Sequence, residues 1–173
     1  MRMLTIRTAG VADAATLQQV ARESYLHHFA HLWQVAAEME EFLADEYNRD
    51  TLEAELANPE ILWLLAESAG QPIGFAKVCW NRPRPDNNEP GALLQKLYLM
   101  PEQTSQGYGR QLWEQVLAAA RQQGQKSLWL TVLQNNPRAR TFYLRHGMES
   151  IQTLPFSSVS QRSLMDLLVM PLP

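Results

Sequence analysis

The chain opens with the alternation of apolar and polar side chains that is typical of a half-buried strand. Residues 4–7 alternate in this way, and Asp13 then offers a cap for a helix over residues 14–29. Helix-forming residues return over 38–55, with a break expected near residues 48–50. The pattern therefore predicts one strand followed by two helical segments.

Strand-like runs and helical periodicity alternate through the rest of the chain. The interleaving predicts an α/β (α+β) fold: a mixed, largely antiparallel sheet of about six to seven strands flanked by about four helices, on both faces. The expected strands are 61–67, 73–80, 93–100, 127–133, 148–153 and 164–170, the expected helices are 111–122 and 137–146, and the expected loops are the hairpin 68–72 and the proline-rich segment 81–90.

Composition narrows the class of protein. With 173 residues, of which 46% are hydrophobic and 19% charged, the chain fits one globular domain over residues 1–173. A net charge of -3 argues against a nucleic-acid partner. The only cysteine is Cys79, which excludes an intrachain disulfide and fits a reducing compartment. The N-terminus lacks a signal-peptide pattern and no run is long enough to cross a bilayer, so we expect a cytoplasmic protein without a membrane partner.

One candidate site is a glycine turn between the strand at 93–100 and the helix that follows. Gly107 and Gly109 stand where the helix begins, and Arg110 stands in its first turn. Such a turn directs several backbone N–H groups and the positive end of a helix dipole at one point, where an anion can bind. The alternative is that the glycines serve only the dihedral angles of the turn. The Rossmann and P-loop patterns both fail here.

A second candidate segment lies over 135–148. Asn136 followed by Pro137 is a good cap and first residue for a helix, on which Ala139 and Tyr143 share one face. Taken alone, this segment is better explained as a capped amphipathic helix whose Phe142 and Tyr143 pack into the core.

Taken together, the two segments resemble the GCN5-related N-acetyltransferase (GNAT) superfamily in order, separation and content. Two positions depart from the family pattern: Thr104 replaces the usual arginine or glutamine of the turn, and Met148 replaces a phenylalanine. The matching residues are Leu97, Tyr98, Leu99, Pro101, Glu102, Gly107, Gly109, Asn136, Ala139, Phe142, Tyr143 and Gly147.

The resemblance implies acetyl-CoA as acyl donor and a primary amine as acceptor. The amine attacks the thioester directly, a strand N–H near 97–99 stabilises the tetrahedral oxyanion, and Tyr143 is the general acid that protonates the departing thiolate. Many relatives carry a glutamate base where this chain has Gln95, so no base is assigned. The implied cofactor-binding residues are Leu97, Tyr98, Leu99, Ser105, Gln106, Gly107, Tyr108, Gly109, Arg110, Asn136 and Tyr143.

Two further interpretations stay open at this point. Because of Thr104 and Gln95, the alternative function is a non-catalytic acyl-CoA-binding sensor of the same fold. A homodimer is also expected as a possible assembly, since dimers are common in the family. His27 and His31 stand one helical turn apart, but no third ligand accompanies them, so no metal site is predicted.

The family pattern also suggests which residues meet the acceptor. Tyr25, His28, Phe29 and Trp33 are expected near it. The segments 42–48, 52–58 and 73–78 resemble bacterial spermidine/spermine N-acetyltransferases, which implies a polyamine or similar small amine. Eight acidic residues over 38–55 would attract such a cation, although they are also explained as a solvated helix face.

Overall fold

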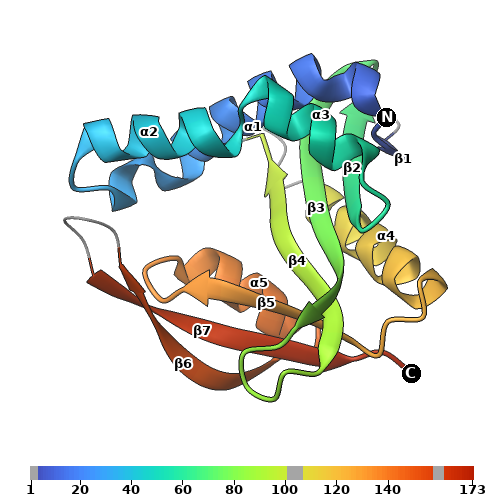
Figure 1. Ribbon diagram of the computed structural model, residues 1–173, viewed down its shortest axis with the longest axis vertical. Helices are drawn as coiled ribbons and strands as arrows, with labels where there is room; N and C mark the ends of the chain where they lie inside the picture. The colour runs from blue at the N-terminus through green and yellow to red at the C-terminus, as the bar shows by residue number, and fades with distance from the viewer. Residues whose placement is uncertain (1–3, 101–106, 158–161) are drawn as a thin grey trace.

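One mixed sheet with helices on both faces organises the molecule. The computed structural model describes residues 4–100, 107–157 and 162–173 (Figure 1). The strands are β1 (Leu4–Thr8), β2 (Ile61–Ser68), β3 (Gln71–Pro83), β4 (Pro90–Leu99), β5 (Ser127–Leu133), β6 (Glu149–Ser157) and β7 (Arg162–Pro171); the helices are α1 (Ala14–Phe29), α2 (Ala36–Glu46), α3 (Arg49–Ala57), α4 (Tyr108–Gln122) and α5 (Pro137–Arg145), with short 3-10 turns η1 (Val11–Asp13) and η2 (Ala30–Leu32).

The sheet has the strand order β1-β2-β3-β4-β5-β7-β6. Within the described residues every neighbouring pair is antiparallel except β4 and β5, which run parallel. This confirms the predicted mixed, largely antiparallel sheet. A parallel neighbour requires a crossover connection, and α4 supplies it.

The helix count differs from the expected four because the segment over 38–55 forms two helices. Asn48 separates α2 from α3, and its side-chain oxygen accepts hydrogen bonds from the backbone N–H groups of Asp50 (2.8 Å) and Thr51 (3.3 Å). An asparagine in this geometry caps a new helix and ends the preceding one. The break expected at 48–50 is therefore a full helix boundary.

Each face of the sheet has its own hydrophobic core. Helices α1, α2 and α3 cover one face, where Leu17, Leu52 and Phe75 are fully buried together. Helices α4 and α5 cover the other, around Leu112 and Trp113. Figure 1 shows the first three helices gathered at one end of the view, with α4 and α5 on other parts of the sheet. The two cores place helices on both faces, as the sequence predicts.

Several boundaries move outward from the expected positions. The predicted loop at 81–90 is shorter, because β3 continues to Pro83 and β4 begins at Pro90. The Arg84 N–H donates to the Glu89 carbonyl (3.0 Å) and closes the turn that remains. Helix α4 begins at Tyr108, three residues earlier than predicted, directly after Gly107.

Candidate active site

The sheet opens between β4 and β5. The two strands pair only at Ala92 with Leu128 and Leu93 with Trp129, after which they separate. Gly91 permits the close approach at the paired end, since a Cβ there would collide with the Ser127 side chain. The predicted cofactor positions of β4 lie beyond the last paired residue, along the open part.

Backbone groups of β4 face this opening. The Met100 N–H donates to the Ile73 carbonyl of β3 (2.7 Å). Because N–H directions alternate along a strand, Leu97 and Leu99 direct their N–H and C=O groups away from β3. Unpaired strand N–H groups in such a gap can hydrogen-bond an extended amide chain or a developing oxyanion.

The carbonyl of Leu99 is already occupied by α1. His28 Nε2 lies 2.7 Å from this oxygen and Ser24 Oγ lies 3.4 Å from it. Since a carbonyl only accepts, Nε2 carries the proton. Burial lowers the pKa of His28, which favours the neutral ring and leaves a lone pair on Nδ1. His28 thus contacts β4, the strand predicted to hold the acyl donor, and its hydrogen bond connects α1 to that strand.

Of the predicted glycine turn, the structure describes Gly107 and the first turn of α4. Gly107 caps α4 with φ of 75°, a left-handed conformation that favours glycine. The Tyr108 side chain is buried in the core, and Arg110 pairs with Glu114 (3.1 Å) in solvent. Among the described residues of this turn, Gly107 to Arg110, the backbone groups therefore remain available to an anion. The predicted residues Ser105 and Gln106, with Thr104, lie outside the described residues.

Tyr143 lies on the inner face of α5. Asn136 caps this helix, its side-chain oxygen accepting from the Ala139 N–H (3.3 Å), so only the amide NH2 remains for a ligand. Tyr143 packs against Trp113, with ring centroids 5.8 Å apart. Burial raises the pKa of Tyr143 well above its ordinary value, so the phenol is protonated and able to donate. No partner within the described residues takes that proton in a hydrogen bond.

A polar cluster missed by sequence analysis holds α5 against β7. The buried Asp166 carboxylate accepts hydrogen bonds from Arg140 of α5 (2.6 Å), Gln134 (2.9 Å) and Thr153 (3.3 Å). The bonds from Gln134 and Arg140 lower the pKa of Asp166. Its members are up to 32 residues apart in sequence, so no local pattern predicts it. The cluster fixes the helix that carries Tyr143.

The predicted acceptor residues Tyr25, Phe29 and Trp33 come together in one aromatic cluster. Trp33 Nε1 donates to the Tyr25 hydroxyl (2.8 Å), and the Tyr25 and Phe29 ring centroids lie 4.9 Å apart. Burial raises the pKa of Tyr25. Two residues that the sequence analysis did not assign to the acceptor complete the cluster: Phe42, 5.2 Å from Tyr25, and Tyr98 of β4, 5.2 Å from Phe29. The aromatic cluster reaches the strand predicted to hold the cofactor.

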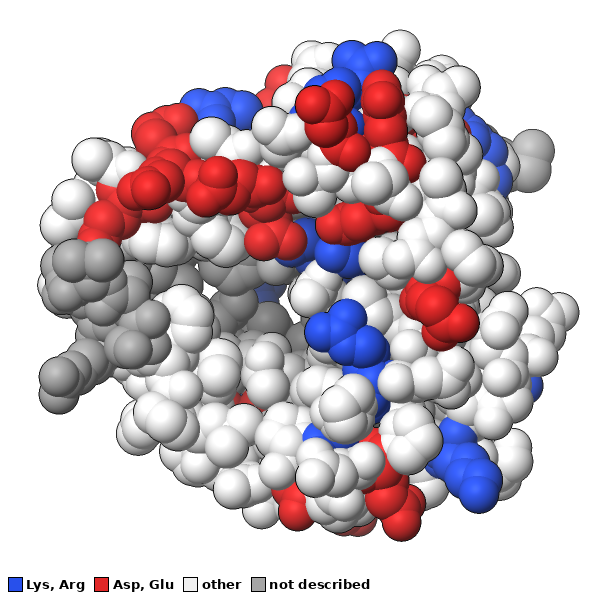
Figure 2. Space-filling view, in the orientation of Figure 1, with Lys and Arg blue, Asp and Glu red and all other residues white. Residues whose placement is uncertain are grey.

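Acidic side chains gather along α2 and α3 on the face shown in Figure 2, with basic side chains just beneath them. Half of the eight predicted acidic residues are neutralised by ion pairs, and the lysines among their partners are buried. Burial lowers the pKa of one of these lysines, Lys96. The pairs are Glu40 with Arg22 (2.9 Å), Glu46 with Lys96 (3.0 Å), Glu53 with Arg49 (3.1 Å) and Glu55 with Lys77 (2.7 Å).

Gln95 and Cys79 have simple structural explanations. In the pairing of β3 with β4, Lys77 opposes Lys96 and Val78 opposes Leu94, which leaves Gln95 as the extra, exposed residue of a β-bulge. Cys79 is buried and burial raises the pKa of its thiol, so it is a core residue.

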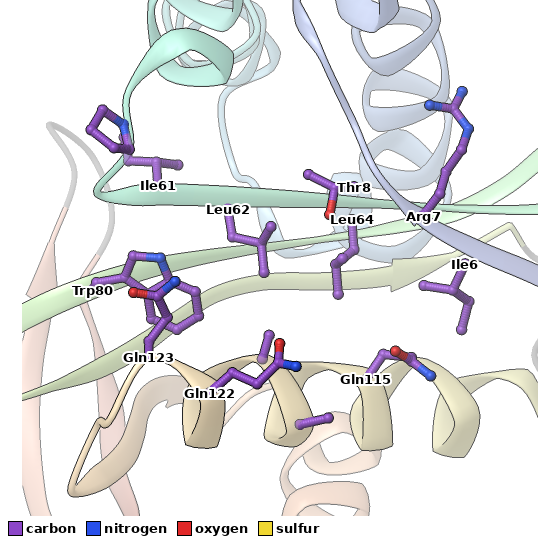
Figure 3. Close-up of a pocket in the computed structure, with 13 residues that line it drawn as sticks. Ile6, Arg7, Thr8, Ile61, Leu62, Leu64, Trp80, Gln115, Gln122 and Gln123 are labelled. Atoms are coloured by element: carbon purple, nitrogen blue, oxygen red, sulfur yellow. The ribbon is translucent and has the colours of Figure 1, made fainter.

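One groove on the surface carries none of the predicted chemistry. Figure 3 shows a groove of about 410 Å³ between α4 and the β1–β2 edge, with Ile6, Leu62, Leu64 and Trp80 on its apolar side. None of the predicted site residues lines it.

Across the described ranges no three metal-ligating side chains meet, and none of the described helices is long and apolar enough to span a membrane.

Comparison with known proteins agrees with this geometry. The chain is 28% identical over 112 residues to an uncharacterized N-acetyltransferase of Lactobacillus delbrueckii subsp. lactis, covering 64% of this chain and 65% of that protein. It is 28% identical over 152 residues to a spermidine N(1)-acetyltransferase of Thermoplasma acidophilum, covering 84% and 88% respectively. The chain spans less than two thirds of the length of the first curated relatives it matches.

The fold is shared with a solved structure of PaiA N-acetyltransferase from Thermoplasma acidophilum in complex with coenzyme A. The TM-score is 0.76 at 24% identity, covering 95% of this chain and 98% of the other. The family model for the acetyltransferase (GNAT) family matches residues 21–148. The open β4–β5 edge, the glycine-capped α4 and the buried tyrosine of α5 thus belong to a chain that is a member of the GNAT acetyltransferase family.

Proposed function

We propose that this protein is an acetyl-CoA-dependent N-acetyltransferase whose acceptor is a small primary amine. The observation that carries the proposal is the opening between β4 and β5. The N–H groups of Leu97 and Leu99 lie along one edge of this opening, and Tyr143 of α5 belongs to the hydrophobic core on the α4–α5 face of the sheet. This is where an extended acyl donor can pair with a strand that lacks a neighbour.

The residues present fit the acyl donor. The first-turn N–H groups of α4, after Gly107, can bind the pyrophosphate, and the β4 N–H groups can bind the pantetheine amides. Acetyl-CoA supplies an activated acetyl thioester. As the C–N bond forms and the C–S bond breaks, the Tyr143 phenol donates its proton to the thiolate sulfur. The proton that the amine nitrogen loses returns to the phenol through solvent, so the products are the N-acetylated amine and free CoA.

Side chains on the α1–α3 side support a cationic amine as the acceptor. The aromatic cluster of Tyr25, Phe29, Trp33, Phe42 and Tyr98 offers ring faces to an organic cation. Glu41, Asp45 and Asp50 have no ion pair within the described residues and add negative charge to the same side. The resemblance to a spermidine N(1)-acetyltransferase makes a polyamine the leading candidate.

The test is release of free thiol from acetyl-CoA on addition of an amine panel: spermidine, spermine, monoamines and a peptide with a free N-terminus. We expect saturable release with the polyamines and a kcat/KM at least 10-fold lower with the peptide, because the peptide carries less positive charge.

Two outcomes would contradict the proposal in different ways. Turnover with the peptide alone would overturn the small-amine acceptor and keep the acyltransferase. Binding of acetyl-CoA without thiol release for any amine would support the non-catalytic acyl-CoA sensor instead.

A further inference from the structure

One titratable side chain lies at the opening between β4 and β5 without an assigned chemical role. His28, near the end of α1, is half-buried, and its Nε2 lies 2.7 Å from the Leu99 carbonyl oxygen. The neighbouring Met100 N–H donates to β3, so the backbone groups of Leu99 point to the other side, into the opening. The His28 ring is therefore held at the edge of this opening.

The ring lies where the two parts of the proposed site meet. The His28 and Phe29 ring centroids are 6.2 Å apart and Phe29 packs against Tyr98, so His28 borders the aromatic cluster proposed for the acceptor. The N–H groups of Leu97 and Leu99, proposed for the acyl donor, lie along the strand edge that His28 contacts. Two residues along a strand span about 7 Å. A base at His28 is thus close to both substrates.

One ring nitrogen of His28 is free to accept a proton. Because Nε2 donates its hydrogen to the Leu99 carbonyl, Nδ1 holds a lone pair, and within the described residues no donor occupies it. The two nitrogens of an imidazole point in nearly opposite directions, so Nδ1 is directed away from the strand edge. The carbonyl also fixes the tautomer and orients the ring, as an orienting group does for a catalytic base.

The carboxylates of the α1–α3 side are less suited to this role. Glu46 and Glu55 are each paired with a buried lysine, at 3.0 Å and 2.7 Å, and the unpaired Glu41 and Asp45 are exposed to solvent. A carboxylate that neutralises a buried ammonium cannot take up a proton without leaving that charge alone. His28 combines a free lone pair, partial burial and a place at the opening.

We propose that His28 is the general base of the reaction, with Nδ1 accepting the proton that the amine nitrogen loses as it bonds to the acetyl carbon. The inference rests on the proposed function. As the C–N bond forms, the nitrogen gains positive charge and its proton becomes acidic, so a neutral imidazole can remove it. The C–S bond then breaks, and Tyr143 protonates the thiolate. The His28 imidazolium releases its proton to solvent, from which the Tyr143 phenolate regains one.

The groups around His28 set the pH range in which it can act. Burial lowers its pKa, the hydrogen bond to the Leu99 carbonyl opposes this effect, and the charges of His27 on α1 and Arg138 on α5 lower the pKa further. The ring is therefore neutral at pH 7 and becomes protonated only below its ordinary value of about 6.5. Protonation removes the lone pair, so kcat should fall as the pH drops through the lowered pKa.

The test is the pH dependence of kcat for wild type and His28→Gln, measured by thiol release at saturating acetyl-CoA and amine. The glutamine amide can still donate to the Leu99 carbonyl, so the variant removes the base and keeps a donor to β4. We expect kcat at pH 7 to fall about 100-fold. The acidic inflection of wild type, below about pH 6.5, should disappear, while calorimetry gives an acetyl-CoA affinity within about 2-fold of wild type.

The matched control is His31→Gln, because His31 is an exposed histidine in η2. It should keep the wild-type kcat and the acidic inflection. Ser24→Ala controls for the attachment of α1, since Ser24 Oγ is the second group near the Leu99 carbonyl (3.4 Å). This variant should keep the inflection.

A second measurement uses His28→Ala, in which added imidazole should restore kcat in a saturable manner. An unchanged kcat in His28→Gln, a reduced kcat that keeps the wild-type inflection, or the absence of that inflection from wild type would overturn the assignment of His28 alone. Failure of wild type to release thiol with any amine of the panel would overturn the proposed function itself.

Discussion

The α4–α5 face and the α1–α3 face of the sheet are built in different ways. On the α4–α5 face the core is almost wholly apolar, around Leu112, Trp113 and Leu128, and the functional groups that we propose there are mostly backbone N–H groups and one tyrosine. On the α1–α3 face, lysines of β3 and β4 are buried and paired with glutamates of α2 and α3. The first face keeps its geometry through backbone and apolar packing, and the second depends on charge pairs between distant segments.

This difference implies different weaknesses. Removal of one partner of a buried ion pair costs several kcal/mol in the free energy of unfolding, because the remaining charge is left in an apolar environment. A site made of backbone groups contains no charged partner that a substitution can remove. The substitutions that matter there are at residues that set a backbone dihedral angle or donate a proton.

The largest effect is expected from Glu55→Gln. Glu55 holds the buried Lys77 ammonium at 2.7 Å and accepts from Trp63 Nε1 at 3.2 Å. Without the negative charge, Lys77 loses its counter-ion, at a cost of about 3 kcal/mol in the free energy of unfolding. Urea unfolding of the two proteins measures this difference.

The matched control lies two residues away on the same helix. Glu53 pairs with Arg49 at 3.1 Å, but both side chains are exposed. Glu53→Gln should cost less than about 0.5 kcal/mol. Equal costs for Glu53→Gln and Glu55→Gln would contradict the view that the α1–α3 face depends on buried charge.

The corresponding test of the α4–α5 face is Tyr143→Phe. Loss of the buried phenol removes the proposed proton donor and should lower kcat about 100-fold, while affinity for acetyl-CoA changes little. Thiol-release kinetics and calorimetry measure the two quantities.

Tyr47→Phe is a control of identical chemistry on the opposite face. The Tyr47 hydroxyl is buried without a hydrogen-bond partner among the described residues, so its removal should leave kcat unchanged. A Tyr143→Phe variant with wild-type kcat would remove Tyr143 from the mechanism.

The sequence predicted the α4–α5 face better than the α1–α3 face for a physical reason. The glycine turn and the α5 helix are continuous segments, so the capping residues Gly107 and Asn136 could be predicted from local pattern alone. The helix attachment at Leu99 joins residues 71 positions apart, and nothing local marks His28 as its partner.

Asp166→Asn tests a buried carboxylate on the α4–α5 face. Hydrogen bonds hold the pKa of Asp166 below its unfolded value of about 3.9. Its contribution is therefore present above that value and disappears as the pH falls through the folded pKa. The variant should lose about 2 kcal/mol at neutral pH, with the difference from wild type shrinking below about pH 4. If the difference in the free energy of unfolding between wild type and variant stayed constant from pH 7 to pH 2, the charge of the Asp166 carboxylate would not contribute to stability.

The smallest effect is expected where a single dihedral angle sets the anion-binding turn. Gly107 has φ of 75° and open space around its Cα, so Gly107→Ala introduces backbone strain without a steric clash. The expected cost is about 1 kcal/mol in the free energy of unfolding. Gly10→Ala is the matched control, since Gly10 also has open space but an ordinary φ of -112°, and it should change stability by less than about 0.5 kcal/mol. If the two variants unfold at the same urea concentration, the left-handed conformation of Gly107 does not constrain the start of α4. The backbone geometry of the proposed pyrophosphate site would then be fixed by packing contacts and not by this glycine.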